Sequence, residues 1–297
     1  MATAGTSAPP RRRLAPVRHD CQRLPLPPAD ALDAGAFGGT LGVFAGHPLD
    51  TLRTRQQQPS SPAGLRAVWA ATVHHEGVRA LFKGMSGPLA TSAIGNAICF
   101  HAYHATGRLI TGTDAGPSTY AGMFVAGCAA GAATTALVTP VDVLKIRSQV
   151  HVGKVQGPLA LTATILSTEG VRGLFRGVGV TFLRDTPSTG IYYASYEAAR
   201  DAAGNRGAGT DAATLCAGAL AGVLSWLSIY PLDVVKSRIQ ASPGRYTGML
   251  DCALRSLREE GPAVFARGLP ACLLRAALVN AAIFGGYEAS IELLRTL

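Results

Sequence analysis

A ten-residue segment occurs three times in this chain with nearly equal spacing, as PLDTLRTRQQ from Pro48, PVDVLKIRSQ from Pro140 and PLDVVKSRIQ from Pro231. Two further markers keep the same register. A pair of glycines precedes each proline, and a Glu-Gly and then a basic residue with Gly follow it. Such repetition constrains the fold before any local pattern does, because each unit buries its apolar faces against its neighbours. The sequence therefore predicts one body of three similar modules, over residues 31–112, 113–205 and 206–297.

The composition of the chain favours a membrane protein over a soluble one. It is 48% hydrophobic and 15% charged, whereas soluble domains carry charge on about a quarter of their residues. A soluble helical stack would need a charged outer face on each helix, and none is visible. The glycine pairs suit helices that approach each other closely in lipid. They are Gly35 and Gly39, Gly127 and Gly131, and Gly218 and Gly222.

Each module offers two nearly uncharged stretches, and a bilayer span needs about 20 apolar residues. The first stretch ends at the Pro-x-Asp, and the second begins at the basic-Gly pair. Between them lies a charged stretch, such as Leu65–His75 or Met249–Glu259, that is typical of a short helix on the membrane surface. We expect six membrane helices with both termini on one side. The predicted spans are Ala34–Leu49, Gly84–Gly107, Ala115–Val141, Gly177–Tyr196, Ala212–Leu232 and Gly268–Tyr287.

Charge and special residues narrow the class further. Because the basic residues lie between apolar spans, the net charge of +9 suits anionic lipid or an anionic or zwitterionic solute better than nucleic acid. The six cysteines form no CxxC pair, so we expect no metal and no disulfide. No nucleophile–base set or P-loop is present, so we expect neither an enzyme nor a cofactor. Residues 1–30 have the composition of either a disordered basic tail or a mitochondrial presequence.

The triplicated motif Pro-x-Asp-x-x-basic-x-Arg-x-Gln is highly specific, and over residues 30–295 the chain resembles the mitochondrial carrier family. The segments FLRDTPSTGIYYASYE and LLRAALVNAAIFGGYE are most similar to the branch of basic amino acid, ornithine and carnitine/acylcarnitine carriers. The resemblance implies an all-α membrane protein, a six-helix barrel with threefold pseudosymmetry around a central solute path. It implies alternating access in the mitochondrial inner membrane, with the termini toward the intermembrane space. A monomer suffices, because one chain encloses the path.

The resemblance also implies a ring of ion pairs that closes the matrix side and breaks when solute passes. Three helices kinked by proline would bring these charges together. Buried ion pairs are weak stabilisers but good switches, which favours a gate over static structural pairs. The expected pairs are Asp50 with Lys145, Asp142 with Lys236 and Asp233 with Arg53, braced by Gln57, Gln149 and Gln240 one turn beyond each cation. Outside the ring, Arg55, Arg147 and Arg238 are expected to pair with Glu76, Glu169 and Glu260.

Lipid is expected at the start of the second helix of each module. Free N–H groups and an adjacent basic residue suit a lipid phosphate there, and similar sites in the family hold cardiolipin. The residues concerned are Gly84, Gly177 and Gly268.

The opposite, cytoplasmic gate is incomplete by comparison with the aromatic-acid-x-x-basic pattern of the family. The second module keeps Glu197 and Arg200, whereas the third has Glu288 but no cation. One strong bridge, Glu288 with Arg200, is therefore available. We expect a weak gate on this side, with His104 as a pH-sensitive substitute for the acid in the first module.

Solute ligands are expected where the modules differ, because a solute is not threefold symmetric. Counting along the second helix of each module from the basic-Gly pair gives polar residues about one turn apart on one face. An Arg184-Asp185 pair within a membrane is costly, which makes a functional site the default interpretation. The predicted site consists of Thr91, Ser92, Gly95, Asn96, Arg184, Asp185, Arg275 and Asn280.

Arg followed by an acid resembles the mark of amino-acid carriers. An Arg would hold a carboxylate, and Asp185 would receive an ammonium. Ornithine-type carriers have an acid where this chain has Gly95, so carnitine, choline-like and methylated amino-acid substrates gain ground. A proton or anion leak carrier is the first rival, but simple anion passage needs no Asp185. A non-transporting membrane scaffold is the second, and the intact charges at all three kinks argue against it.

Overall fold

The computed structural model describes residues 29–59, 61–62, 64–113, 116–153, 157–202, 212–276, 278–279 and 282. Every regular element in that part of the chain is helical. The long helices are α1 (Ala29–Gln56), α3 (Ser86–Thr111), α4 (Tyr120–Val150), α7 (Val178–Ala202) and α8 (Ala212–Ala241), and the backbone is helical again over 269–276. The short ones are α2 (Leu65–Glu76), η1 (Val78–Phe82), α5 (Pro158–Glu169), α6 (Val171–Leu174), α9 (Met249–Glu260) and η2 (Pro262–Ala266).

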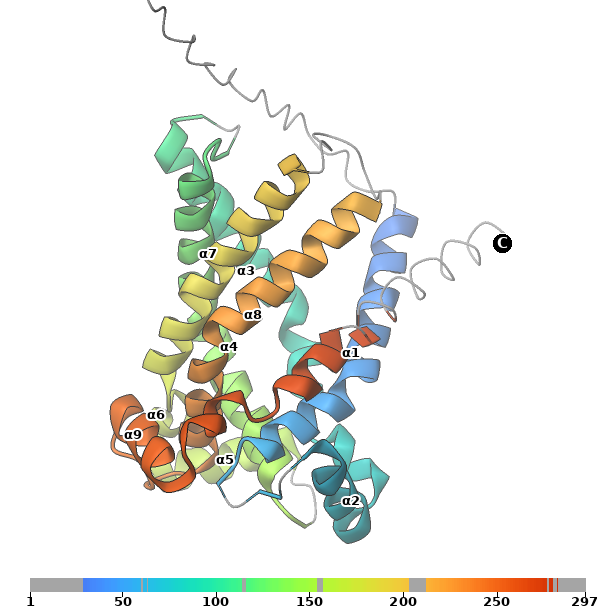
Figure 1. Cartoon of the computed structure of the whole chain (residues 1–297), viewed down its shortest axis with the longest axis vertical. Helices are drawn as coiled ribbons and strands as arrows, with labels where there is room; N and C mark the ends of the chain where they lie inside the picture. Colours follow the sequence, from blue (N-terminus) through green and yellow to red (C-terminus); the bar gives the residue numbers. More distant parts are fainter. Residues whose placement is uncertain are drawn as a thin grey trace, which may run out of the picture.

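The helices follow one order three times, as the sequence predicts. A long helix with an internal proline is followed by a short helix, a single helical turn and the start of a second long helix. In Figure 1 the short helices gather at one end of the molecule, together with the C-terminal ends of α1, α4 and α8. The all-helical fold class is thereby confirmed, and α1 begins at Ala29, inside the stretch predicted to be a tail. The rest of that stretch lies outside the described residues.

One helix of the described part, α4, has both the length and the apolarity of a membrane span, judged by length and composition alone. The other long helices contain 25 to 30 residues, which exceeds the length that a bilayer needs. The charges Arg184 and Asp185 lie within α7 and lower its apolarity. Large apolar side chains such as Phe100, Phe182 and Leu227 are about half exposed on the outside of the bundle.

The helix contacts explain one of the glycine pairs. A Cβ atom on Gly131 would lie 2.5 Å from the carbonyl oxygen of Asp185, and one on Gly127 would lie 2.8 Å from the Cα of Gly190. The backbones of α4 and α7 therefore touch at these two residues, as predicted. At Gly222 no described atom lies within 4 Å of such a Cβ, and much of the helix that follows in this module lies outside the described part, so close approach there remains a prediction. The surroundings of Gly35, Gly39 and Gly218 lie outside the described part.

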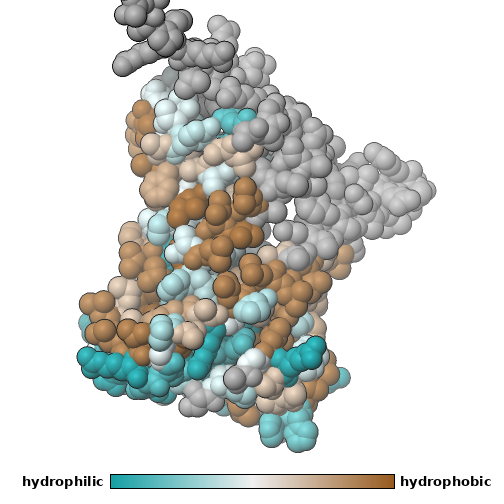
Figure 2. Space-filling view, viewed as in Figure 1, coloured by the Kyte–Doolittle hydropathy of each residue, from teal (hydrophilic) through white to brown (hydrophobic). Residues whose placement is uncertain are grey.

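Each short helix packs on the long helix before it. Leu49 and Leu52 of α1 form a buried cluster with Val68 of α2. In the third module Val235 of α8 packs against Cys252 of α9. Hydrophilic side chains lie along the lower edge of the molecule near α9, while apolar ones cover its middle (Figure 2). The two predicted short helices are thus present, as α2 and α9.

Candidate functional site

Three ion pairs join the C-terminal halves of α1, α4 and α8, and each matches a pair expected from the sequence. Lys145 Nζ donates to Asp50 Oδ2 over 2.8 Å. Lys236 pairs with Asp142, and Arg53 pairs with Asp233. We call these six residues the inner ring. Every pair links two different modules, so the ring ties α1 to α4, α4 to α8 and α8 to α1.

Two of the ring aspartates hold a second cation that the sequence did not predict. Asp50 uses Oδ2 for Lys145, and its Oδ1 lies 2.7 Å from Nε of Arg275. Asp233 uses Oδ2 for Arg53, and its Oδ1 accepts a hydrogen bond of 2.8 Å from Nη1 of Arg184. Asp142 pairs with Lys236 alone among the described residues. The three ion pairs of the ring therefore follow the threefold symmetry, but the additional cations on Asp50 and Asp233 do not.

The bracing glutamines differ from one another. Gln57 Nε2 donates to Asp233 Oδ2 over 2.9 Å, so this brace is confirmed. Gln149 instead donates to the hydroxyl of Thr51, and Gln240 donates to the carbonyl oxygen of Arg176 and the hydroxyl of Thr181. The prediction was wrong for these two. Their position one turn beyond a cation is the same, but each faces a neighbouring helix that presents a threonine there instead of a carboxylate.

Two aromatic rings support Arg53, and no motif in the sequence predicted this contact. Its guanidinium carbon lies 4.6 Å from the centre of the Trp226 ring and 5.5 Å from that of Tyr230, both on α8. Such cation–π contacts strengthen when the cation is desolvated. Arg53 is buried, so the Arg53–Asp233 pair is the most heavily supported of the three.

Three arginines further along the same helices join each module to the next one. We call these arginines and their partners the outer ring. Each donates through Nη1 to the glutamate of its own module, as predicted, and through Nε to a carbonyl oxygen of the next module. The glutamate contacts are all 2.5 Å, and the carbonyl contacts are 2.8, 3.1 and 2.8 Å. The sets are Arg55 with Glu76 and Gln149, Arg147 with Glu169 and Gln240, and Arg238 with Glu260 and Gln57.

Electrostatics at the outer ring follow from these contacts. Burial alone would raise the pKa of Glu76, but hydrogen bonds from Arg55 and Lys83 outweigh it and lower that pKa to about 2. The hydrogen bond from Arg147 likewise lowers the pKa of Glu169. These carboxylates therefore stay ionised at any physiological pH, and the outer ring is not a pH switch.

The predicted Arg184-Asp185 pair exists and reaches the inner ring. Arg184 Nε donates to Asp185 Oδ1 over 2.6 Å, and its side chain is 16% exposed. No hydrogen bond or ion pair joins Oδ2 of Asp185 to the described residues. Arg184 therefore joins two carboxylates, Asp185 on its own helix and Asp233 on α8, while Asp185 keeps one oxygen available. Ser188 on the next turn of α7 lies 2.7 Å, hydroxyl to hydroxyl, from Ser225 of α8.

The remaining predicted site residues vary in how much the structure says of them. The hydroxyls of Thr91 and Ser92 bond to carbonyl oxygens of their own helix, those of Gly87 and Leu89. Asn96 is exposed, and a Cβ on Gly95 would meet no atom of the described residues within 4 Å. Asn280, Glu288 and the side chain of Arg200 lie outside the described part, so the expected Glu288–Arg200 bridge remains a prediction.

Backbone conformation favours glycine at the second position of each basic-Gly pair. Their φ angles are +75° at Gly84, +76° at Gly177 and +84° at Gly268, values that only glycine adopts readily. Each lies just before a long helix rather than within it. A Cβ on Gly84 would also lie 3.0 Å from the carbonyl oxygen of Lys145 in the inner ring.

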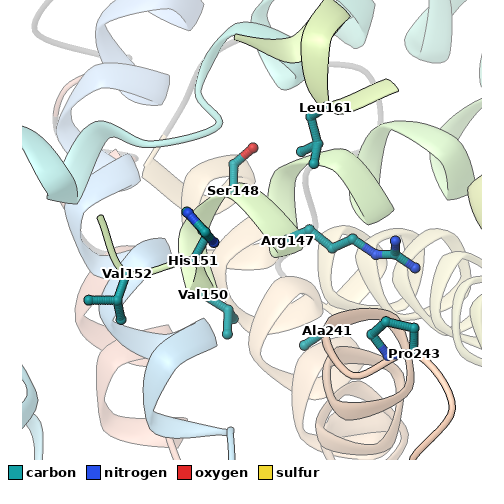
Figure 3. A pocket seen from close by; sticks show the side chains of 8 residues that line it. All are labelled: Arg147, Ser148, Val150, His151, Val152, Leu161, Ala241 and Pro243. Carbon is teal, nitrogen blue, oxygen red and sulfur yellow. The ribbon is translucent and has the colours of Figure 1, made fainter. Parts of the chain in front are cut away.

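Two cavities lie beside the rings, in the described part of the chain. One, of about 380 Å³, is lined by Gly84, Lys83 and Arg79 and by Gly157 at the start of α5. The other, of about 410 Å³, lies between the ends of α4 and α8 and is lined by Arg147, Ser148, Val150, His151, Val152, Leu161, Ala241 and Pro243 (Figure 3). Neither includes Arg184, Asp185 or Arg275.

Comparison with known proteins gives these residues a context. The model of the family described as mitochondrial carrier protein matches residues 25–114, 116–207 and 209–297. The chain is 41% identical over 267 residues to the mitochondrial arginine transporter of Arabidopsis thaliana, covering 88% of this chain and 90% of that protein. It is 39% identical over 270 residues to the human mitochondrial basic amino acids transporter (86% and 88% covered). With the rat mitochondrial carnitine/acylcarnitine carrier protein it shares 33% over 288 residues (91% and 96% covered).

Proposed function

The chain belongs to the mitochondrial carrier family, and on that premise we propose that it moves a cationic or zwitterionic amino acid or a carnitine-like metabolite across the inner membrane by alternating access. Three tandem family matches imply the six-helix carrier fold, and members of this family are transporters rather than enzymes. The relatives bear names that specify arginine, basic amino acids, and carnitine and acylcarnitine. The proposed substrate class is what these names share.

The observation that carries the proposal is the arrangement of Arg184, Asp185 and Arg275. Asp185 has one carboxylate oxygen held by Arg184 and one with no hydrogen bond or ion pair in the described part, which suits an ammonium or methylated amine. Arg184 and Arg275 both present guanidinium groups that can hold a carboxylate. A solute with an amine and a carboxylate therefore finds a partner for each end.

The inner ring supports the proposed alternation of access. We assign it to the matrix side of the path, with the termini toward the intermembrane space, because the family pattern has this orientation. The six buried or half-buried charges of the ring are fully paired, so breaking them costs free energy that only a bound solute would offset. At the other end, Glu197, Arg200 and Glu288 would form the weaker gate. A monomer suffices for this cycle.

Lipid binding is part of the proposal at Gly84, Gly177 and Gly268. The cavity beside Gly84 supports it, because the cationic side chain of Arg79 and the backbone before α5 line the same space. The ammonium of Lys83 is already held by Glu76 and two carbonyl oxygens. A phosphate of cardiolipin would meet free N–H groups and positive charge together there.

Uptake into liposomes that contain the purified protein tests the proposal. Labelled arginine, lysine, ornithine, carnitine, choline and a dicarboxylate are offered in turn. We expect uptake of a cationic or zwitterionic amine, at least tenfold slower in the variant Asp185→Asn. The matched control is Asp251→Asn, the same change on α9. In the described part of the chain, Asp251 pairs only with Arg255 and the backbone at Thr247. Uptake of the dicarboxylate alone would refute the proposed substrate class.

A further inference from the structure

Four tyrosine rings form a continuous cluster beside the proposed solute site. The ring of Tyr103 on α3 stacks on that of Tyr193 on α7, with the two ring centres 4.2 Å apart. Tyr193 meets Tyr192 edge to face with centres 5.8 Å apart, and Tyr192 lies nearly parallel to Tyr196 with centres 6.2 Å apart. Since α3 and α7 both pack on α4, the contact between Tyr103 and Tyr193 passes over one side of that helix. We call these four residues the tyrosine cluster.

Tyr192 is the member of the cluster that shares a face of α7 with Asp185. The two residues are seven apart, which is about two helical turns or about 10 Å along the helix. Arg184, next to Asp185, donates a hydrogen bond to Asp233 of α8, so this face looks toward the inner ring. Helical side chains lean toward the N-terminus of their helix, so the ring of Tyr192 extends back toward Asp185. Tyr192 is 39% exposed, which leaves part of its ring accessible to a solute.

The position of Tyr192 differs among the modules, as expected of a residue that contacts a solute without threefold symmetry. In register with it stand Cys99 in the first module and Ile283 in the third. Four residues further on, all three modules repeat a tyrosine, which marks a feature that they have in common. Asp185, like Tyr192, has no counterpart of its own kind in the other two modules. The second module therefore supplies both an acid and an accessible aromatic ring.

An acid and an aromatic ring together favour particular cations. An aromatic face attracts a cation electrostatically, and the attraction grows when both are desolvated. A primary ammonium is compact and strongly hydrated, with three N–H donors that carboxylates and water satisfy better than a ring does. A methylated ammonium has lost these donors to methyl groups, and a guanidinium is weakly hydrated and stacks on aromatic faces. Both of these cations gain from the ring in addition to the acid.

We propose that Tyr192 is a specificity-determining residue of the solute site, which packs a methylated ammonium or a guanidinium against Asp185 and so selects these cations over a primary ammonium. This inference rests on the proposed function and narrows its substrate class. The rest of the tyrosine cluster holds the ring of Tyr192 in place, because Tyr193 meets its edge and Tyr196 lies along its face.

Competition between matched solutes tests this selectivity in liposomes that contain the intact carrier. Lysine, Nε-trimethyllysine and arginine each compete with the labelled amine that the carrier transports best. In the wild type we expect trimethyllysine, arginine or both to reach half-inhibition at a concentration at least threefold lower than lysine does. Tyr192→Ile, which copies the residue of the third module, should abolish this preference. Tyr192→Phe keeps the aromatic face and should retain it.

The matched control is Tyr246→Ile, the same change at the other end of the bundle, where Tyr246 packs against Val235 and Cys252. It should leave the preference as in the wild type. Because the preference is a ratio measured within one variant, a smaller amount of folded carrier does not alter it. An equal response of all three solutes to Tyr192→Ile overturns the inference, and so does a loss of preference in Tyr192→Phe as large as in Tyr192→Ile.

The outcomes also separate this inference from the proposed function. If the three amines compete equally well in the wild type and in Tyr192→Ile, the proposed substrate class stands and the role of Tyr192 fails. If no amine is transported or competes and only the dicarboxylate is taken up, both fail. If the preference for one cation alone depends on Tyr192, the inference holds and that cation is the group that the ring receives.

Discussion

Charge reversal should succeed at one pair of the inner ring and fail at another. The double variant Asp142→Lys with Lys236→Asp exchanges two residues whose ion-pair partner, in the described structure, is only each other. The double variant Asp50→Lys with Lys145→Asp restores the same attraction but places an ammonium against Arg275. Two unit charges about 4 Å apart interact by about 4 kcal/mol at an effective dielectric constant near 20. At this pair, an attraction of that size becomes a repulsion.

Even a quarter of the change from attraction to repulsion, about 2 kcal/mol, shifts the equilibrium between the closed and the open ring more than tenfold. The assay is solute uptake into liposomes, with each single variant beside its double. We expect the Asp142/Lys236 double to exceed its singles at least tenfold and the Asp50/Lys145 double to remain at the level of its singles. Equal rescue of both would refute the reasoning.

The melting temperature in detergent isolates the repulsion from transport. Adding Arg275→Gln to the Asp50/Lys145 double removes the facing cation and should raise the melting temperature of that variant. The same addition to the wild-type carrier removes an attraction from Asp50 and should lower it. A change of the same sign in both backgrounds would show that Arg275 does not interact with that acid.

Two further predictions concern the rest of the closed end. Gln57→Ala removes a hydrogen bond to the carboxylate of Asp233, which is worth about 1.5–3 kcal/mol, whereas Gln240→Ala removes only bonds to neutral groups, worth about 0.5–1.5 kcal/mol. Because both side chains are buried, Gln57→Ala should lower the melting temperature more than Gln240→Ala. Equal drops in melting temperature would contradict the difference between the two glutamines. The pKa of Glu76 is lowered from 4.5 to about 2, so its stabilisation is complete above pH 4.5 and is lost as the pH falls toward 2. The melting-temperature gap between wild type and Glu76→Gln should therefore be constant at neutral pH and narrow in acid; a gap that changes between mildly acidic and mildly alkaline buffer would contradict it.

Repetition predicted that the charges of the three modules would meet, and the resemblance to the mitochondrial carrier family implied which acid pairs with which cation. Identical motifs at identical places in three modules reach the same height in the bundle, so Asp and Lys or Arg of neighbouring modules meet. The outer arginines were predicted for the same reason with respect to their glutamates. Their bonds to the next module's carbonyl oxygens were not, since a backbone acceptor leaves no mark on the sequence.

The link between site and ring could not be predicted from the sequence. Arg184 and Arg275 were correctly singled out as unlike their counterparts in the first module, where Thr91 stands. Their long side chains, however, extend from the site to Asp233 and Asp50 of other modules. Spacing along one helix places a Cα at a given depth, but it does not say how far a flexible side chain reaches across the bundle.

The second cations on Asp50 and Asp233 also imply an order in which the ion pairs of the ring break. A solute held by Arg184 and Arg275 would weaken the pairs of Asp50 and Asp233, which join α1 to α4 and α1 to α8. The remaining pair, Asp142 with Lys236, joins α4 to α8 and has no arginine of the site to lose. Both weakened pairs thus involve α1, and the intact one does not. We therefore expect α1 to separate first while α4 and α8 stay together.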